Sequence, residues 1–263
     1  MTLMPEISPS AKKPVFCLVH GRYHGGGCWK YLQKELRERG YHSIAPTLEI
    51  QDRSMSLDDH AASVVDEVTS LGPENVILAG WSWGANVILR KTTEMPVRQL
   101  QFVAPSLQAV SYARASMLQE ISPPPKEDSR YTLLYDAWKN QEQDVDDREL
   151  AQELGVLLFY HDVSSGIRNR YLKSFRSHPR HDGDEPVLEH FPEDIPKVTF
   201  KTLHDRVLRQ EWLEWQATLL SSSADTLPAN GSVEGINTGH SPMLARPGLL
   251  AELMTRHAED TAV

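Results

Sequence analysis

The sequence contains one serine whose setting favours nucleophilic chemistry. Ser82 is the centre of the G-x-S-x-G pattern at residues 80–84, which follows the apolar run 75–79 and precedes a segment of helical periodicity. The pattern is typical of a tight turn from a strand into a helix, where small residues on either side of the serine permit a strained backbone. Such a turn places the hydroxyl above the sheet at a helix N-terminus, so we expect Ser82 to be a nucleophile.

A serine hydroxyl needs a base to accept its proton, and the base needs a carboxylate to orient it. After a turn of this kind the acid comes next along the chain and the histidine last, each in a loop that follows a late strand. Asp205 follows the predicted strand 197–203, and His240 lies in the loop NTGHSP before the last predicted helix. The sequence therefore predicts a triad of Ser82, Asp205 and His240.

Other residues compete for the two partner roles. The chain has 11 histidines. His204 adjoins Asp205, and His257 lies in the last predicted helix, where a solvated surface position is the simpler interpretation. Glu234 is the reserve candidate for the acid, and an ordinary surface turn is the alternative interpretation of Asp205 itself.

Acyl transfer also needs two donors that bind the oxyanion. In turns of this kind the residue after the nucleophile supplies one, here the backbone N–H of Trp83, and the loop after the first strand supplies the other. That loop is HGRYHGGG at residues 20–27, and the backbone N–H of Arg22 is the candidate. The glycine run does not predict a phosphate-binding loop, because no Lys-Ser/Thr follows it and it lacks the GxGxxG spacing.

The elements that must position these residues alternate between strand and helix. Short β-branched runs are each followed by a segment of helical periodicity, which predicts a parallel sheet with helices on both faces. Ser56 and Asp59 predict a capped start for one of these helices. The expected strands are 15–20, 42–46, 75–80, 100–105, 197–203 and, more weakly, 231–236, and the expected helices are 29–39, 57–71, 85–93, 210–220 and 247–257.

The strand pattern is interrupted once, over residues 106–195. This segment is far longer than an ordinary loop, so we expect a helical cap inserted after the fourth strand. The predicted domains are a core of residues 14–105 and 196–263 and a cap of residues 106–195, preceded by a disordered tail at residues 1–13. The helices expected within the cap are 112–120, 131–141, 148–159 and 167–175.

Composition argues against several classes of protein. The 263 residues carry 27 Lys and Arg against 36 Asp and Glu, a net charge of -9 without a long basic cluster, which argues against a nucleic-acid partner. The chain shows neither a signal sequence nor a membrane-spanning apolar run, so we expect no membrane contact and a cytoplasmic location. Cys17 and Cys28 are interpreted as two buried, reduced thiols rather than a disulfide framework.

Five segments together resemble the α/β-hydrolase superfamily, and within it the small branch of plant methyl-ester esterases, hydroxynitrile lyases and bacterial esterase-like relatives. The segments are LVHGRYHGGGCW, AGWSWGA, LFYHD, LHDRVL and TGHSPM, within a match that extends from about Val15 to Leu253. The resemblance implies a six-stranded, mostly parallel sheet with a helical cap after the fourth strand. It also implies that Ser82, Asp205 and His240 act without a metal or a cofactor.

Two positions favour the esterases over the lyases of this branch. The lyases have a threonine directly after the first loop histidine and a lysine directly after the catalytic histidine, whereas this chain has Gly21 and Ser241 there. The chain departs from the branch at Trp81 and Trp83, which flank the serine, and at Arg22, where a small residue is usual. Bulky indoles beside the nucleophile are expected to narrow or reshape the acyl pocket.

We therefore expect a serine hydrolase that cleaves a carboxylic ester, or a lactone, of a small and largely apolar substrate through an acyl-enzyme intermediate. A lyase or a carbon–carbon or amide-bond hydrolase with the same triad is the alternative chemistry, and a non-catalytic ligand receptor is a further alternative. The expected assembly is a monomer or a homodimer. Candidate pocket residues, each with plain packing as its alternative role, are Tyr23, Trp81, Leu157, Tyr160 and Met243.

Overall fold

The computed structural model describes residues 13–52, 54–91, 95–107, 153, 155–176, 192, 194–221 and 231–260. Within these ranges, six strands form one sheet in the order β2-β1-β3-β4-β5-β6, and every neighbouring pair is parallel. The loops that follow the strands therefore meet at one edge of the sheet. The strands are β1 (Val15–Val19), β2 (Ser43–Ile44), β3 (Val76–Trp81), β4 (Gln99–Val103), β5 (Lys197–Thr202) and β6 (Gly231–Ile236).

Side chains of the central strands alternate between two apolar cores, one on each face of the sheet. In β1, Phe16 and Leu18 belong to the first core, whereas Cys17 and Val19 belong to the second. All six residues of β3 are buried. Burial on both faces explains why these strands are continuous apolar runs rather than alternating ones.

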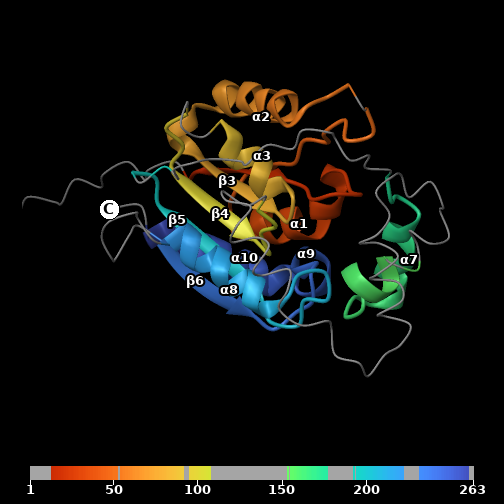
Figure 1. The fold of residues 1–263 in the computed structure, drawn as a ribbon. Coiled ribbons are helices and arrows are strands. Elements are labelled where there is room, and N and C mark those ends of the chain that lie inside the picture. The colour runs from red at the N-terminus through yellow and green to blue at the C-terminus, as the bar shows by residue number, and fades with distance from the viewer. Residues whose placement is uncertain are drawn as a thin grey trace, which may run out of the picture.

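The helices are divided between these two cores. Helices α1 (Lys30–Glu38) and α10 (Pro247–Asp260) pack together and contribute to the first core. Helices α2 (Leu57–Leu71), α3 (Gly84–Arg90) and α8 (Gln210–Ser221) contribute to the second, and Figure 1 shows α2 and α3 on the same side of the strands. The predicted sheet with helices on both faces is thus confirmed.

Local signals set several boundaries as predicted. Helix α2 begins at a capping box, in which the Ser56 hydroxyl accepts from the Asp59 N–H (3.2 Å) and the Asp59 carboxylate accepts from the Ser56 N–H (2.8 Å). Strand β2 is shorter than predicted, because it is an edge strand that pairs only with β1 and is soon followed by Pro46, which has no N–H to donate. The remaining short elements of the core are η1 (Gly26–Trp29), η2 (Pro73–Asn75) and α9 (Pro242–Ala245).

Two described helical segments lie between β4 and β5. They are the π-helical turn η4 (Gly155–Phe159) and helix α7 (Ser165–Leu172), and Figure 1 shows α7 at one end of the molecule, beyond α1 and α9. They overlap the predicted helices 148–159 and 167–175. The predicted helices 112–120 and 131–141, and all but residue 13 of the predicted tail, lie outside the described residues.

The structure also bears on the predicted state of the two cysteines and on the possibility of a membrane-spanning helix. Cys17 and Cys28 are both buried free thiols, as predicted. Burial raises the pKa of the Cys17 thiol to about 12, which makes it a poor nucleophile. None of the helices in the described ranges has the length and apolar character needed to cross a membrane.

Candidate active site

Ser82 lies at the turn between β3 and α3 in a strained backbone conformation. Its φ is +52°, in the left-handed region that residues with a Cβ rarely adopt. A Cβ on Gly80 would come within 2.7 Å of the Gly84 carbonyl oxygen, and a Cβ on Gly84 within 2.6 Å of the His20 carbonyl oxygen. Close backbone approach therefore explains both glycines of the pattern.

The loops after β5 and β6 bring an acid and a histidine together. Nδ1 of His240 lies 2.7 Å from Oδ2 of Asp205, and neither side chain has exposed surface. A carboxylate oxygen accepts, so Nδ1 carries the hydrogen and Nε2 of the neutral ring carries the lone pair. Asp205 thus orients His240 in the tautomer that can act as a base through Nε2.

Further hydrogen bonds hold the Asp205 carboxylate. Oδ2 also accepts from the Thr202 hydroxyl (2.6 Å), and Oδ1 accepts from the N–H groups of Val207 and Leu208 (2.8 Å each). Burial on its own raises the pKa of Asp205, but the attraction to a protonated His240 and these hydrogen bonds outweigh it, so that this pKa lies below its ordinary value. Asp205 is therefore ionised at neutral pH and can stabilise a protonated His240.

Three loops converge around Ser82. The indole N–H of Trp81 donates to the His240 carbonyl oxygen (2.7 Å), which ties the loop after β6 to the residue before the serine. On another side, a Cβ on Gly21 would lie 3.0 Å from Cβ of Ser82, so the loop after β1 also reaches it. Nε2 of His240 is buried and has no hydrogen-bond partner among the described residues.

The competing residues identified in the sequence lie elsewhere. The Glu234 carboxylate accepts from Arg256 (2.6 Å) and contacts Nε2 of His257 (3.1 Å), at the edge strand β6. His204 is exposed. The structure therefore brings Asp205, rather than the reserve residue Glu234, to His240.

His20 orients the candidate oxyanion donor at Arg22. Its Nδ1 lies 2.9 Å from the Gly21 carbonyl oxygen, and its Nε2 accepts from the Leu48 N–H (3.0 Å). A carbonyl only accepts, so the ring is neutral with its hydrogen on Nδ1, and burial lowers the pKa of His20 to about 4. The Gly21 carbonyl and the Arg22 N–H belong to one planar peptide, so this hydrogen bond also sets the direction of the N–H.

The two indoles that flank Ser82 point into different cores. Trp83 is the N-cap residue of α3, a position where backbone N–H groups lack partners within the helix. Its indole packs against His60 in the second core (ring centroids 5.6 Å apart), whereas Trp81 lies in the first. Of the two indoles expected to narrow or reshape the acyl pocket, that of Trp81 lies in the same core as the other candidate pocket residues and that of Trp83 does not, because the turn at Ser82 reverses the face to which the chain points.

The candidate pocket residues gather in the first core. Trp81, Tyr160 and Met243 are fully buried there, and the partly buried Tyr23 and Leu157 pack against them. Tyr23 has a φ of +63°, and its ring stacks on that of Phe175 (centroids 5.8 Å apart), so the loop after β1 and the segment after α7 are in contact.

Three residues near this site had no role assigned from the sequence. Thr202 donates to Asp205, His24 contacts the Tyr160 hydroxyl, and Asp162 accepts from the Gly239 N–H (2.6 Å). Tyr160 and Asp162 lie in the segment LFYHD, and the resemblance of this segment to the family is the one sequence feature that could have indicated a role for them. Each of the latter two contacts joins residues far apart in the chain, which local pattern cannot reveal.

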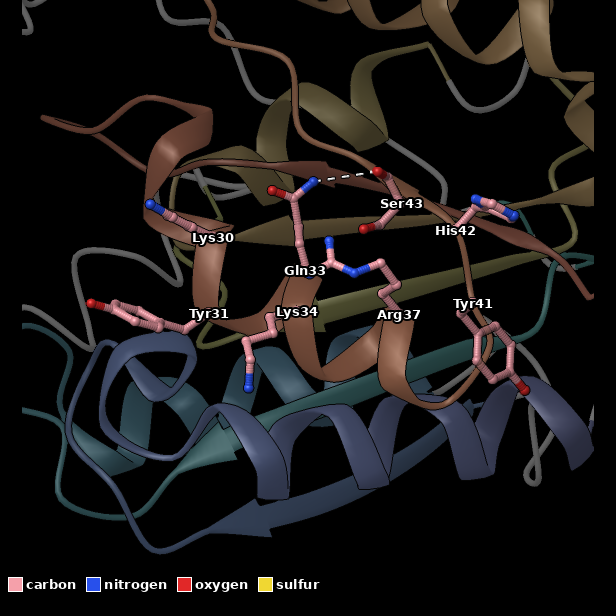
Figure 2. Close-up of a pocket in the computed structure, with 8 residues that line it drawn as sticks. All are labelled: Lys30, Tyr31, Gln33, Lys34, Arg37, Tyr41, His42 and Ser43. Atoms are coloured by element: carbon pink, nitrogen blue, oxygen red, sulfur yellow. Dashed lines mark hydrogen bonds between the residues drawn. The ribbon is translucent and has the colours of Figure 1, made fainter.

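A hollow of about 380 Å³ lies apart from this site, along α1 and β2 (Figure 2). Figure 2 shows the side chains of Tyr31 and Tyr41 at opposite ends of it, and no residue of the loops around Ser82 lines it. In the part of the chain that the structure describes, no three His, Cys, Asp or Glu side chains are grouped as a metal ion would need. The residues lining the hollow are Lys30, Tyr31, Gln33, Lys34, Arg37, Tyr41, His42 and Ser43.

Comparison with solved structures shows the same fold in several enzymes. A pyrethroid hydrolase is 18% identical with a TM-score of 0.68, covering 95% of this chain and 99% of that chain. A methylesterase from Arabidopsis is 18% identical with a TM-score of 0.68, covering 94% and 99%. Polyneuridine aldehyde esterase is 15% identical with a TM-score of 0.69, covering 94% and 99%. At these identities the likeness concerns the fold.

Sequence comparison identifies the family. A carbendazim-hydrolyzing esterase from Nocardioides sp. (strain SG-4G) is 31% identical over 80 residues, which are 28% of this chain and 33% of the esterase. The match thus spans about a third of the length of that curated relative. The model of the alpha/beta hydrolase family matches residues 18–253, which is most of the chain. With the parallel sheet and the strand-to-helix turn at Ser82, this match shows that the chain belongs to the alpha/beta hydrolase family.

Proposed function

We propose that this protein is a serine esterase that hydrolyses small, largely apolar carboxylic esters. Ser82 is the nucleophile, His240 the general base and acid, and Asp205 the carboxylate that orients the histidine. The backbone N–H groups of Trp83 and Arg22 bind the oxyanion. No step of this proposal requires a metal or a cofactor.

The proposed reaction has two halves. Nε2 of His240 accepts the Ser82 proton as the oxygen attacks the ester carbonyl, and Asp205 stabilises the imidazolium that forms. The imidazolium then protonates the departing alcohol, which leaves an acyl group on Ser82. Water repeats the sequence on the acyl-enzyme, with His240 again as the base, and releases the acid.

One observation carries the proposal. The buried Asp205 carboxylate binds Nδ1 of His240, and Nε2 is left without a partner beside the strained turn that presents Ser82. A buried polar atom without a hydrogen bond costs about 1–3 kcal/mol, and a base that must accept a proton from Ser82 would account for that cost at Nε2.

The residues near the proposed triad support an apolar substrate. The cap segment and the loop after β1 contribute aromatic and aliphatic side chains to the first core, and Tyr23 and Leu157 keep part of their surface exposed. These side chains favour an apolar acyl or alcohol group over a charged one. Several of the similar proteins are esterases, which supports ester rather than amide cleavage.

The test compares the parent with Ser82→Ala on p-nitrophenyl esters of short and medium chain length. We expect the parent to hydrolyse them and to be labelled at Ser82 by a fluorophosphonate probe, and the variant to lose both properties. An unlabelled, inactive parent would refute the proposal and favour a ligand receptor. Labelling without ester hydrolysis would instead favour a lyase or a carbon–carbon or amide-bond hydrolase on the same triad.

A further inference from the structure

The segment LFYHD of the cap contacts two catalytic loops from one short turn. Directly after η4, Tyr160 reaches the loop that follows β1, and Asp162 reaches the loop that follows β6. These loops carry the candidate oxyanion donor Arg22 and the candidate base His240. Two residues of the cap thus touch both halves of the proposed machinery without being part of it.

The first contact runs through His24. Nδ1 of His24 lies 2.6 Å from the Arg22 carbonyl oxygen, and its Nε2 contacts the Tyr160 hydroxyl. The carbonyl can only accept, so Nδ1 carries the hydrogen and Nε2 accepts from Tyr160. Burial lowers the pKa of His24 to about 3 and raises that of Tyr160 well above its ordinary value, which keeps the ring neutral and the phenol protonated.

The loop that His24 holds needs such support. Tyr23 has a φ of +63°, a conformation that persists in a non-glycine residue only when its surroundings impose it. The hydrogen bond from His24 fixes the carbonyl of Arg22, immediately before the strained residue. A second cap residue, Arg176, donates its backbone N–H to the Tyr23 carbonyl oxygen (2.9 Å) on the other side.

The second contact is made directly before His240. Oδ2 of Asp162 accepts from the Gly239 N–H at 2.6 Å. A Cβ on Gly239 would come within 2.4 Å of Cε1 of His161 and 2.7 Å of Oδ1 of Asp162. The cap turn therefore packs so closely against the backbone of Gly239 that a side chain at this position would displace His161 or Asp162.

We propose that Tyr160 and Asp162 are positioning residues, through which the cap holds the oxyanion loop and the His240 loop at the mutual distance that the reaction needs. The inference rests on the proposed esterase function. It gives the cap a second role besides enclosing the substrate. The catalytic loops reach their working geometry only while residues 160–162 contact both of them.

The test uses two disrupting variants, a rescuing variant and a matched control. Tyr160→Phe removes the hydroxyl that His24 accepts from, and Asp162→Leu removes the acceptor for Gly239. Asp162→Asn keeps an amide oxygen at that place and serves as the rescue. Tyr171→Phe is the control, because the Tyr171 hydroxyl also joins the cap to the core but donates to the Gly27 carbonyl oxygen (3.0 Å), which lies in η1, five residues beyond Arg22.

We expect Tyr160→Phe and Asp162→Leu to lower kcat for a p-nitrophenyl ester at least about tenfold with KM changed less than about twofold, because misplaced catalytic groups affect chemistry more than binding. Phosphonate labelling slows in parallel. Asp162→Asn recovers to within about threefold of the parent, and Tyr171→Phe keeps its kcat. The proposal is overturned if the disrupting variants retain kcat, or if the control loses as much.

Amide hydrogen exchange provides a readout that does not depend on activity. Exchange should quicken in residues 21–24 of Tyr160→Phe and in residues 238–241 of Asp162→Leu, and in neither segment of the control. Unchanged exchange in these loops would refute the positioning role even in an inactive protein. An inactive, unlabelled parent with the expected exchange pattern would refute the esterase proposal and leave the contacts of the cap established.

Discussion

The buried histidine His24 makes the stability of this fold depend on pH in a way that can be calculated. Burial is the main cause that lowers the pKa of His24 to about 3, and the nearby His20 and His240 add to the effect. In the unfolded chain its pKa returns to about 6.5. Between these two pKa values the unfolded state binds more protons than the folded state, so the free energy of unfolding falls as the pH is lowered.

The size of the effect follows from the two pKa values. At pH 5 a histidine with an unfolded pKa of 6.5 and a folded pKa of 4 or lower costs about 2 kcal/mol of stability, and the loss begins as the pH falls through about 6.5. This figure barely depends on the folded pKa, because His24 stays neutral in the folded state at pH 5. His20, whose pKa burial lowers to about 4, contributes a second loss of similar size.

The assay is denaturant unfolding of the parent and of His24→Asn at pH 7.5 and pH 5. The Asn side chain keeps an N–H near the position of Nδ1 but does not titrate, so we expect its stability to fall by about 2 kcal/mol less than that of the parent over this interval. Tyr160→Phe is the control: it is destabilised at both pH values but retains the histidine and the full pH dependence. Equal pH dependence in the parent and His24→Asn would show that His24 is not held neutral.

Two further predictions each compare a pair of variants. Asp205→Asn should lower kcat about 10⁴-fold, since it loses the tautomer and charge that His240 requires, whereas Glu234→Gln should leave kcat for a p-nitrophenyl ester near that of the parent; the reverse order would make Glu234 the acid. Gly26→Ala should destabilise the fold by about 2–3 kcal/mol, because its Cβ would lie 2.0 Å from the Ala45 carbonyl oxygen. Gly27→Ala, with nothing within 4 Å, should stabilise it by about 0.5 kcal/mol, and a denaturant titration that ranks the two alike would refute the steric argument.

Most of the core and the strained turn at Ser82 could be predicted because their signals are local. The G-x-S-x-G turn is recognisable from five consecutive residues, and the contact that requires Gly80, with the Gly84 carbonyl oxygen, lies within the turn itself. The contact that requires Gly84, with the His20 carbonyl oxygen, forms only in the folded chain. Helix α2 begins at the capping box that Ser56 and Asp59 predicted, and it spans the predicted residues 57–71. The weakly predicted strand 231–236 has the expected bounds, because its partner β5 supplies the ladder that its own residues only weakly favour.

Other features depend on contacts between distant parts of the chain. Sequence order left both Asp205 and Glu234 as possible acids, and only the folded loops show which carboxylate meets His240. Likewise the indoles of Trp81 and Trp83, two residues apart, enter opposite cores because the chain turns between them. Along a regular strand, residues two positions apart point to the same face of the sheet, so the strand pattern does not predict a change of face within the turn.

The sequence by itself determined the alternation that builds a parallel sheet, the turn that strains Ser82 and the chain order of the acid and the histidine. Each of these depends on a few neighbouring residues whose backbone preferences act locally. Only the tertiary structure decided that Asp205 is buried against His240, that Tyr160 contacts the loop after β1 and that Asp162 contacts the loop after β6. These contacts join residues 35, 136 and 77 positions apart in the chain. The backbone preferences of neighbouring residues cannot specify such contacts, because they form only when the whole chain has folded.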